Sequence, residues 1–165
     1  MTDVDFRAHV AYFGAFGYEL DPNAMTEDEQ EKVKEQIAFF KKYRKLIQFG
    51  TFYRLEDPFE GDGNAAWMSV SPDKKQAVAA YYKVMATPNP KLKKLLLTGL
   101  DPDKRYYCSR NDRSYYGDEL MNMGLLLDME FTGSSVRKDS ITRKNSGTDA
   151  GDYTSQLYVL ECVDN

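Results

Sequence analysis

Residues 26–48, TEDEQEKVKEQIAFFKKYRKLIQ, are the stretch of this sequence that predicts a long helix most clearly. Thr26 followed by Glu29 fits a capping box, in which each side chain accepts a hydrogen bond from the backbone N–H of the other residue. Acidic residues crowd the first turns and basic residues the last turns, which complements the helix dipole. Gly50 then supplies a stop signal. We expect the rest of the chain to be arranged around the two ends of this helix.

The predicted helix carries an apolar stripe, which has to be buried against another element. Members of the stripe recur at steps of three or four residues, as expected for one face of a helix. They are Val33, Ile37, Phe40, Tyr43 and Ile47, widened by Phe39 and Leu46. The stripe predicts a helix that covers a sheet or packs on a neighbouring domain.

Length and composition narrow the class of protein. The chain has 165 residues, which fits one domain, or one domain and part of another. Its formal net charge of -4 argues against a nucleic-acid surface. Cys108 and Cys162 have no metal-ligand spacing, so we expect no metal and no cofactor. Without a basic leader or a run of 18 apolar residues, the sequence predicts no membrane partner and a cytoplasmic protein.

The regions before and after the helix have different characters. Residues 4–18 form an apolar run ending in glycines, which predicts a buried strand and a close turn. After Gly50, short runs rich in Tyr, Val, Leu and Phe alternate with turn signals, and no second helix is expected. This pattern is typical of an antiparallel β-sandwich or barrel. The runs are 51–55, 65–71, 76–85, 92–98, 104–109, 125–131 and 155–163.

Two segments carry finer predictions. In the last run, Leu157, Val159 and Glu161 should face one way and Tyr158, Leu160 and Cys162 the other, because side chains alternate along a strand. Residues 132–153 contain almost no apolar side chain. They predict a solvated loop or an extended hairpin, and a binding arm is the alternative.

The residues that could carry chemistry give little support for a catalytic site. His9 is the single histidine, and without a nearby Ser or Cys it is interpreted as a core residue. Residues 57–64, DPFEGDGN, lack the pattern of a calcium loop and predict a turn. No pair of carboxylates is nominated for glycoside hydrolysis, which needs two carboxyl groups about 5 to 9.5 Å apart.

Three quoted stretches together resemble a known enzyme family. They are FRAHVAYFGAFGYELDPNAMTEDEQEKVKEQIAFFKKYRKLIQFGTFYRL, AAWMSVSPDKKQAVAAYYKVMATPNPKLKKLLLTGLDPDKRYYC and GDELMNMGLLLD, followed by SQLYVLE near the end. In this order they resemble the carboxyl-terminal part of α-galactosidases (melibiases) of glycoside hydrolase family 36. The resemblance covers about residues 6–128 and the terminal strand.

The resemblance implies a fold and a division of the chain. Family members are retaining galactosidases with a central (β/α)8 barrel and a smaller carboxyl-terminal antiparallel β-sandwich. Residues 1–48 would then be the last strand and last helix of the barrel, and residues 49–165 the sandwich. The expected fold is therefore mainly β, an antiparallel β-sandwich preceded by one strand and one long helix.

No catalytic residue can be carried over from the family. Its nucleophile is the Asp of a Lys-Trp-Asp motif, whereas the single Trp here, Trp67, lies in Ala66-Trp67-Met68. A barrel also needs about 250 residues. The resemblance therefore implies a structural segment, inactive alone, whose partners are the catalytic barrel and, through the whole enzyme, α-galactosides. A homo-oligomer is left open.

A second hypothesis is a carbohydrate-binding module. The chain has 12 Tyr and 9 Phe residues, and aromatic faces can pack on sugar rings. The candidate stacking residues are Tyr106, Tyr107, Tyr115 and Tyr116. Each of them also has an ordinary explanation as a strand residue that packs in a sheet.

Overall fold

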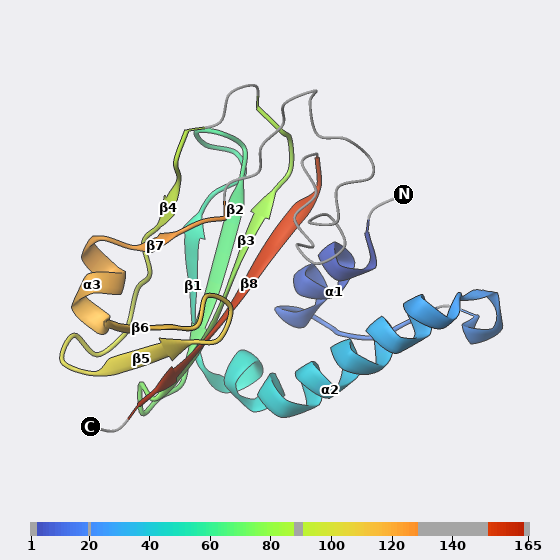
Figure 1. Ribbon diagram of the computed structural model, residues 1–165, viewed down its shortest axis with the longest axis horizontal. Coiled ribbons are helices and arrows are strands. Elements are labelled where there is room, and N and C mark those ends of the chain that lie inside the picture. Colours follow the sequence, from blue (N-terminus) through green and yellow to red (C-terminus); the bar gives the residue numbers. More distant parts are fainter. Residues whose placement is uncertain (1–2, 20, 88–90, 129–151, 164–165) are drawn as a thin grey trace.

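The computed structural model describes residues 3–19, 21–87, 91–128 and 152–163. These residues form three layers, with two helices on one face of a six-stranded sheet and a small second layer on the other face (Figure 1). The helices are α1 (Val4–Tyr12), α2 (Glu27–Phe49) and α3 (Gly117–Asn122), with a short 3-10 helix η1 (Pro22–Ala24). The strands are β1 (Thr51–Glu56), β2 (Ala65–Val70), β3 (Gln76–Lys83), β4 (Lys94–Leu95), β5 (Arg105–Cys108), β6 (Arg113–Tyr116), β7 (Leu125–Leu126) and β8 (Thr154–Cys162).

The long helix forms as predicted. The backbone N–H of Glu29 donates to Thr26 Oγ1 over 3.3 Å, and the N–H of Thr26 donates to Glu29 Oε2 over 3.0 Å, which completes the capping box. Gly50 ends the helix, and its N–H donates to the carbonyl of Leu46 over 2.9 Å. Only the second half of α2 lies directly on the sheet, where Tyr43, Leu46 and Ile47 are buried. Val33 and Ile37, in the first half, remain partly exposed.

The predicted strand within residues 4–18 is wrong, because Val4–Tyr12 is the helix α1. Asp3 caps it by accepting a hydrogen bond from the Asp5 N–H over 2.8 Å. The buried residues Val4, Ala8 and Tyr12 lie four apart, so they share one helical face. An apolar run is compatible with either a helix or a strand, and the spacing of four between the buried residues fits a helix. As a helix, the segment satisfies its own backbone groups and needs no neighbouring strands.

The main sheet is antiparallel, in the order β1-β2-β3-β8-β5-β6. β8 therefore lies between β3 and β5, pairing Val159 with Val78 and Leu160 with Cys108. The predicted alternation along β8 is confirmed. Tyr158 and Leu160 lie in the core on the face of the sheet that is covered by α3, β4 and β7, which are called the second layer below. Leu157 and Val159 pack against the helices on the other face.

The second layer contains β4 and β7, which lie within the predicted runs 92–98 and 125–131, and the helix α3, which the sequence patterns did not predict. β4 pairs with β7 in a two-stranded sheet, and α3 packs beside it. The expectation of no second helix is therefore wrong. α3 has only six residues, too few to show a helical period, and the N–H of Leu97 donating to the carbonyl of Leu120 holds it in place. β6 was not predicted either, and it forms a hairpin with β5 through a turn at Asn111–Asp112.

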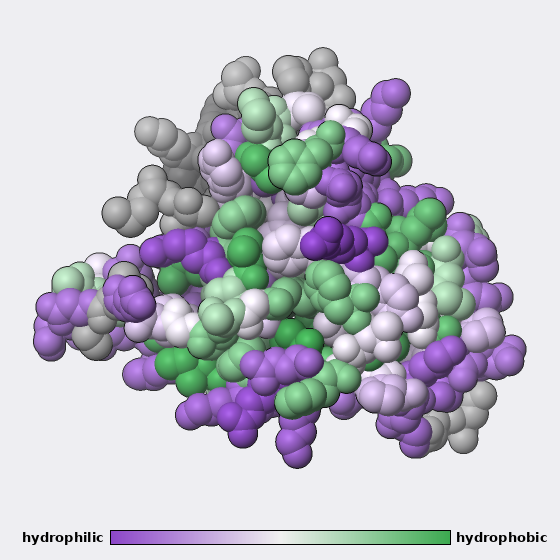
Figure 2. Space-filling view, turned by 180° about the vertical axis from the view of Figure 1, so that it is seen from behind, coloured by the Kyte–Doolittle hydropathy of each residue, from purple (hydrophilic) through white to green (hydrophobic). Residues whose placement is uncertain are grey.

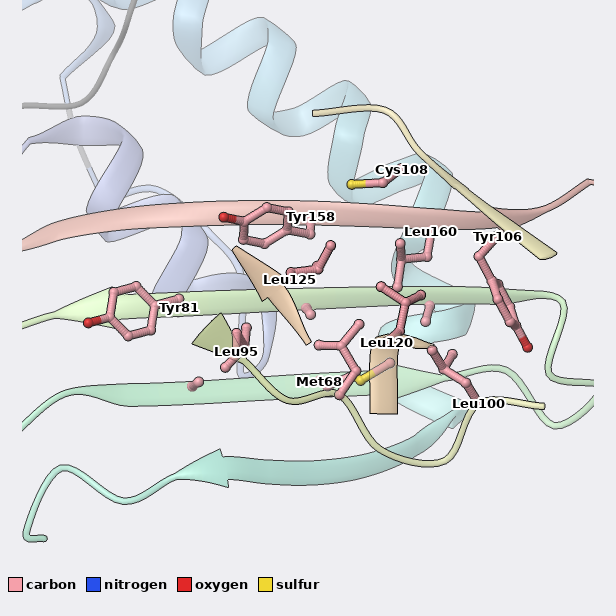
Figure 3. Close-up of a cluster of buried hydrophobic side chains, with 14 of the residues drawn as sticks. Met68, Tyr81, Leu95, Leu100, Tyr106, Cys108, Leu120, Leu125, Tyr158 and Leu160 are labelled. Carbon is pink, nitrogen blue, oxygen red and sulfur yellow. The ribbon is translucent and has the colours of Figure 1, made fainter. Parts of the chain in front are cut away.

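The main core lies between the sheet and the second layer. Figure 3 shows its side chains, with Tyr81 at one end of the cluster and Tyr106 at the other. A second cluster lies under α1 and α2, where Tyr12 and Tyr43 pack with Val78. Seen from behind, the start of α2 projects from the body, and hydrophobic and hydrophilic residues alternate over the surface (Figure 2).

Several other predictions have clear outcomes. Residues 57–64 form consecutive turns, with Asp57 Oδ1 accepting from the Phe59 N–H over 2.9 Å. The run 125–131 is a strand only at 125–126 within the described residues. The loop predicted for residues 132–153 lies outside the described residues, except for Asp152 and Tyr153. No helix among the described residues is long and apolar enough to cross a membrane.

Candidate functional site

The four candidate stacking tyrosines all lie on the β5–β6 hairpin. Tyr106 is paired with Tyr115, and Tyr107 with Ser114, while Tyr116 is paired with Arg105. Because opposite residues of an antiparallel pair share a face, Tyr106 and Tyr115 point to one side and Tyr107 and Tyr116 to the other. The structure therefore does not bring the four rings to one surface.

Tyr106 is a structural residue of the core. Its side chain is fully buried. Its hydroxyl donates to the carbonyl of Lys74 over 2.7 Å and accepts from the N–H of Asp101 over 3.0 Å. Burial raises the pKa of this phenol above its ordinary value. A ring with no exposed face cannot stack on a sugar, so Tyr106 is excluded as a platform.

The other three rings have mixed surroundings. Tyr115 is partly buried against the core, and its hydroxyl accepts from Asn111 Nδ2 over 2.7 Å. Tyr107 donates to Asp112 Oδ1 over 2.8 Å. Tyr116 is the most exposed of the four, at 49% of its surface. Stacking by Tyr107 and Tyr116 on the outer face stays a prediction.

His9 has a polar partner that the sequence did not reveal. Its Nδ1 lies 2.7 Å from Ser155 Oγ at the start of β8, although the two residues are far apart in the chain. The hydroxyl of Tyr82 donates to the carbonyl of His9 over 2.7 Å. Burial lowers the pKa of the imidazole to about 4, which keeps the ring neutral at pH 7. With both ring and backbone held, His9 ties α1 to the sheet, as expected of a satisfied core histidine.

A hollow of about 490 Å³ is lined in part by Tyr81, the residue that lies at the opposite end of the core from Tyr106 in Figure 3. It lies between the residues before β2, the end of β3, the approach to β4, the residues after β7 and the start of β8. Its volume is within the range of small-molecule sites, about 300–1,000 Å³. No sequence pattern predicts this hollow, because its walls come from five separate parts of the chain.

One wall of the hollow is held rigidly by Gln156. Its Oε1 accepts from the Asp128 N–H over 3.0 Å and from the Tyr158 hydroxyl over 2.6 Å. Its Nε2 donates to the carbonyl of Asp128 over 3.2 Å. Arg110 then donates to Asp128 Oδ2 through Nε and an Nη atom, over 2.9 and 2.7 Å. These bonds fix the position of Asp128 at the edge of the hollow.

The lining of the hollow also contains a charge cluster around Lys93. Its ammonium lies 2.9 Å from Glu56 Oε2 and 3.5 Å from Asp62 Oδ2, and 5.3 Å from the centre of the Tyr81 ring. The hydrogen bond to Glu56 and the neighbouring Tyr81 and carboxylates raise the pKa of Lys93 in spite of its burial, which alone would lower it. Lys93 therefore remains a cation at neutral pH.

The described residues hold no cluster of three or more His, Cys, Asp or Glu side chains suited to a metal ion. The arrangement in this part of the chain offers packing surfaces and a polar hollow.

Comparison with protein families gives two matches along the chain. Residues 64–160 match the model of the glycosyl hydrolase family 36 C-terminal domain. Residues 1–50 match the melibiase model. The two matches follow each other in sequence and are separated by residues 51–63, which include β1.

Curated relatives are α-galactosidases. AgaA of Geobacillus stearothermophilus is 50% identical over 121 residues, which are 73% of this chain and 16% of that protein. Mel36A of Lactobacillus acidophilus is 42% identical over 163 residues, which are 99% of this chain and 19% of that protein. The chain thus spans less than a fifth of the length of these curated relatives.

Solved structures agree with these matches. An α-galactosidase from Lactobacillus brevis is 37% identical and superposes with a TM-score of 0.86, covering 100% of this chain and 21% of that one. A variant of AgaA in complex with raffinose is 39% identical with a TM-score of 0.83, covering 99% of this chain and 20% of that one.

Proposed function

Since the chain belongs to glycosyl hydrolase family 36, with the C-terminal domain of that family at residues 64–160, we propose that it works as the C-terminal part of an α-galactosidase. The whole enzyme would release terminal α-galactosyl residues with retention of configuration. Residues 1–48 would belong to its catalytic domain and residues 49–165 would be its C-terminal β-sandwich. This chain would be structural and would not hydrolyse galactosides alone.

The observation that carries this proposal is the order and extent of the matches. A melibiase model over residues 1–50 precedes a C-terminal domain model over residues 64–160. The superposition on the Lactobacillus brevis enzyme extends over 100% of this chain. The absence of a Lys-Trp-Asp motif from the sequence supports the inactive role of the segment.

The inactivity is tested with p-nitrophenyl α-galactoside. We expect the purified 165-residue chain to release no more nitrophenol than a mock preparation. A full-length relative such as AgaA serves as the positive control. Hydrolysis by the chain above the mock value that persists through a second purification step would overturn the proposal that the chain is inactive alone.

The proposal also includes a binding partner and a cellular location. The partner would be the catalytic barrel, on which the segment packs, and a contact between copies of the enzyme is the alternative. A cytoplasmic location is supported by the free thiols of Cys108 and Cys162, which suit a reducing compartment. Cell fractionation and light scattering on the whole enzyme test the two points separately.

A further inference from the structure

Residues 15–19, AFGYE, follow α1 and lie outside every helix and strand of the described residues. Within the described part of the chain, no backbone N–H or carbonyl of these residues makes a hydrogen bond. The last backbone bond before them runs from the N–H of Gly14 to the carbonyl of Ala11, over 3.0 Å. Native proteins pair nearly all of their buried backbone groups, so a segment with a full set of free donors and acceptors is able to bind another backbone.

The side chains of residues 15–19 alternate as they do in a strand. Phe16 and Tyr18 are partly buried, whereas Ala15, Gly17 and Glu19 are exposed. A repeat of two is the period of a β-strand, and five residues are an ordinary length for one. The segment therefore has one face on the protein and one open face.

The closed face of the segment is held by both long helices. The ring centre of Phe16 lies 5.1 Å from that of Tyr12 in α1 and 4.6 Å from that of Phe40 in α2. The hydroxyl of Tyr18 donates to Gln36 Oε1 in α2. Figure 1 shows the chain leaving α1 here and running to η1, at the end of α2 that is far from the sheet. The helices thus fix the position of a segment whose backbone is unpaired.

The order of the elements indicates what kind of backbone would pair with the segment. A strand-like segment between α1 and α2, with both helices on one face, is the arrangement of a parallel sheet covered by helices. An inner strand of such a sheet has a neighbour on each edge. The described strands β1–β8 all belong to the six-stranded and two-stranded sheets, and none of them pairs with residues 15–19. The neighbours would therefore come from elsewhere.

The rest of the catalytic domain fits this role better than a second copy of the chain. A copy would offer the same segment, and two such segments would pair along one edge and leave the other edge of each free. By contrast, the melibiase match over residues 1–50 includes α1, the segment and α2. The part of AgaA that matches this chain is only 16% of that protein. The remaining part of such an enzyme could supply a strand for each edge.

We propose that residues 15–19 form a β-strand whose two edges hydrogen-bond to parallel strands of the remaining catalytic domain. This inference rests on the proposed function and adds to it the contact through which the catalytic domain holds the segment. Backbone groups make the contact, while Phe16 and Tyr18 keep the strand on α1 and α2.

Hydrogen exchange in two proteins tests the proposal. One is the 165-residue chain, and the other is a chimera, AgaA with its matching part replaced by this chain. We expect the amides of residues 15–19 to exchange freely in the chain alone. In the chimera they should exchange about a hundredfold more slowly or less, because a paired strand opens only with its sheet. Residues 76–83 of β3 are the internal control and should be protected in both proteins.

Two substitutions at one position separate the loss of the N–H from the added side chain. Gly17→Pro removes the N–H, whereas Gly17→Ala keeps it, and a Cβ at this position has nothing within 4 Å in the chain. In the chimera, Gly17→Pro should lower Tm relative to Gly17→Ala or prevent folding, since both edges of the strand are paired. In the chain alone, the two variants should unfold at nearly the same temperature. An equal Tm of the two variants in the chimera would contradict the pairing.

The remaining outcomes separate this proposal from the proposed function. Free exchange of residues 15–19 in a folded chimera that hydrolyses p-nitrophenyl α-galactoside would overturn the strand pairing and leave the proposed function intact. Hydrolysis by the chain alone would refute the proposed function without changing the exchange result. Protection of residues 15–19 in the chain alone, with a dimer in light scattering, would assign the edge to a second copy instead. If the chimera does not fold, the chain is mixed with the rest of AgaA, and a lack of association would overturn the proposal.

Discussion

The joint between α2 and β1 allows a quantitative test of how the helix is seated on the sheet. Gly50 has φ -73° and ψ 169°, an extended conformation that any residue can adopt. Space is the constraint, because a Cβ on Gly50 would lie 2.4 Å from the carbonyl oxygen of Leu46 and 2.6 Å from that of Val70. One oxygen belongs to the last turn of α2 and the other to the end of β2. We predict that Gly50→Ala forces these two elements apart.

The magnitude follows from the two contacts. Carbon–oxygen contacts in proteins are about 3.3–3.6 Å. Each of the two carbonyl oxygens would therefore have to move about 1 Å away from the new Cβ. Overpacking of this kind costs about 1–3 kcal/mol. Replacing glycine also lowers the conformational entropy of the unfolded chain, which stabilises the folded protein by about 0.4–1 kcal/mol. The net loss in the free energy of unfolding should be about 1.3 kcal/mol, or a fall in Tm of about 3–5 °C for a chain of this size.

Urea unfolding followed by circular dichroism measures this loss. Gly17→Ala is the matched control, because a Cβ there would have nothing within 4 Å. Gly17→Ala should leave stability unchanged or slightly raise it. Surface substitutions usually change the free energy of unfolding by no more than about 0.5 kcal/mol. If Gly50→Ala changes it by no more than that, the inference that α2 and β2 pack tightly at Gly50 is wrong.

Two further predictions concern His9. Its folded pKa of about 4 lies below the ordinary 6.5, so between these values the unfolded chain binds more protons and stability should fall as the pH is lowered from about 6.5 to 4. Relative to His9→Leu, the parent should lose up to about 3 kcal/mol over that window in urea unfolding, and parallel pH profiles would contradict the buried neutral ring. Tyr82→Phe removes the hydrogen bond to the His9 carbonyl and should cost about 0.5–1.5 kcal/mol, whereas Tyr107→Phe, whose hydroxyl bonds the exposed Asp112, should cost little.

The features predicted correctly from sequence are those set by local rules. The capping box of α2 depends on two residues three apart, and the alternation along β8 depends on the two-residue period of a strand. The family resemblance, which rests on long collinear stretches, is confirmed by both family models. In each case the signal lies within a continuous segment.

The failures have equally specific causes. Residues 4–12 are apolar enough to be a strand, and the helix depends on the cap at Asp3 and on Val4, Ala8 and Tyr12 meeting the elements beneath them. α3 is too short to show a period. The hollow joins Asn64, Lys93 and Gln156 from distant parts of the chain, and the His9–Ser155 contact spans 146 positions. Only the tertiary fold brings such groups together.

The boundary proposed between residues 48 and 49 lies near the end of the melibiase match at residue 50, but it does not separate two independently packed parts. Tyr43 of α2 is buried in one cluster with Val78 of β3, and its hydroxyl donates to Glu161 Oε1 of β8 over 3.1 Å. Tyr12 of α1 stacks on Phe39 of α2 with ring centres 4.8 Å apart, which anchors α1 in the same cluster. The helices and the sheet therefore lose buried surface together if they separate, and a displacement of α2 must be felt by β3 and β8. This shared cluster supports the proposed structural role, because it joins the C-terminal sheet to residues 1–48, which we propose belong to the catalytic domain.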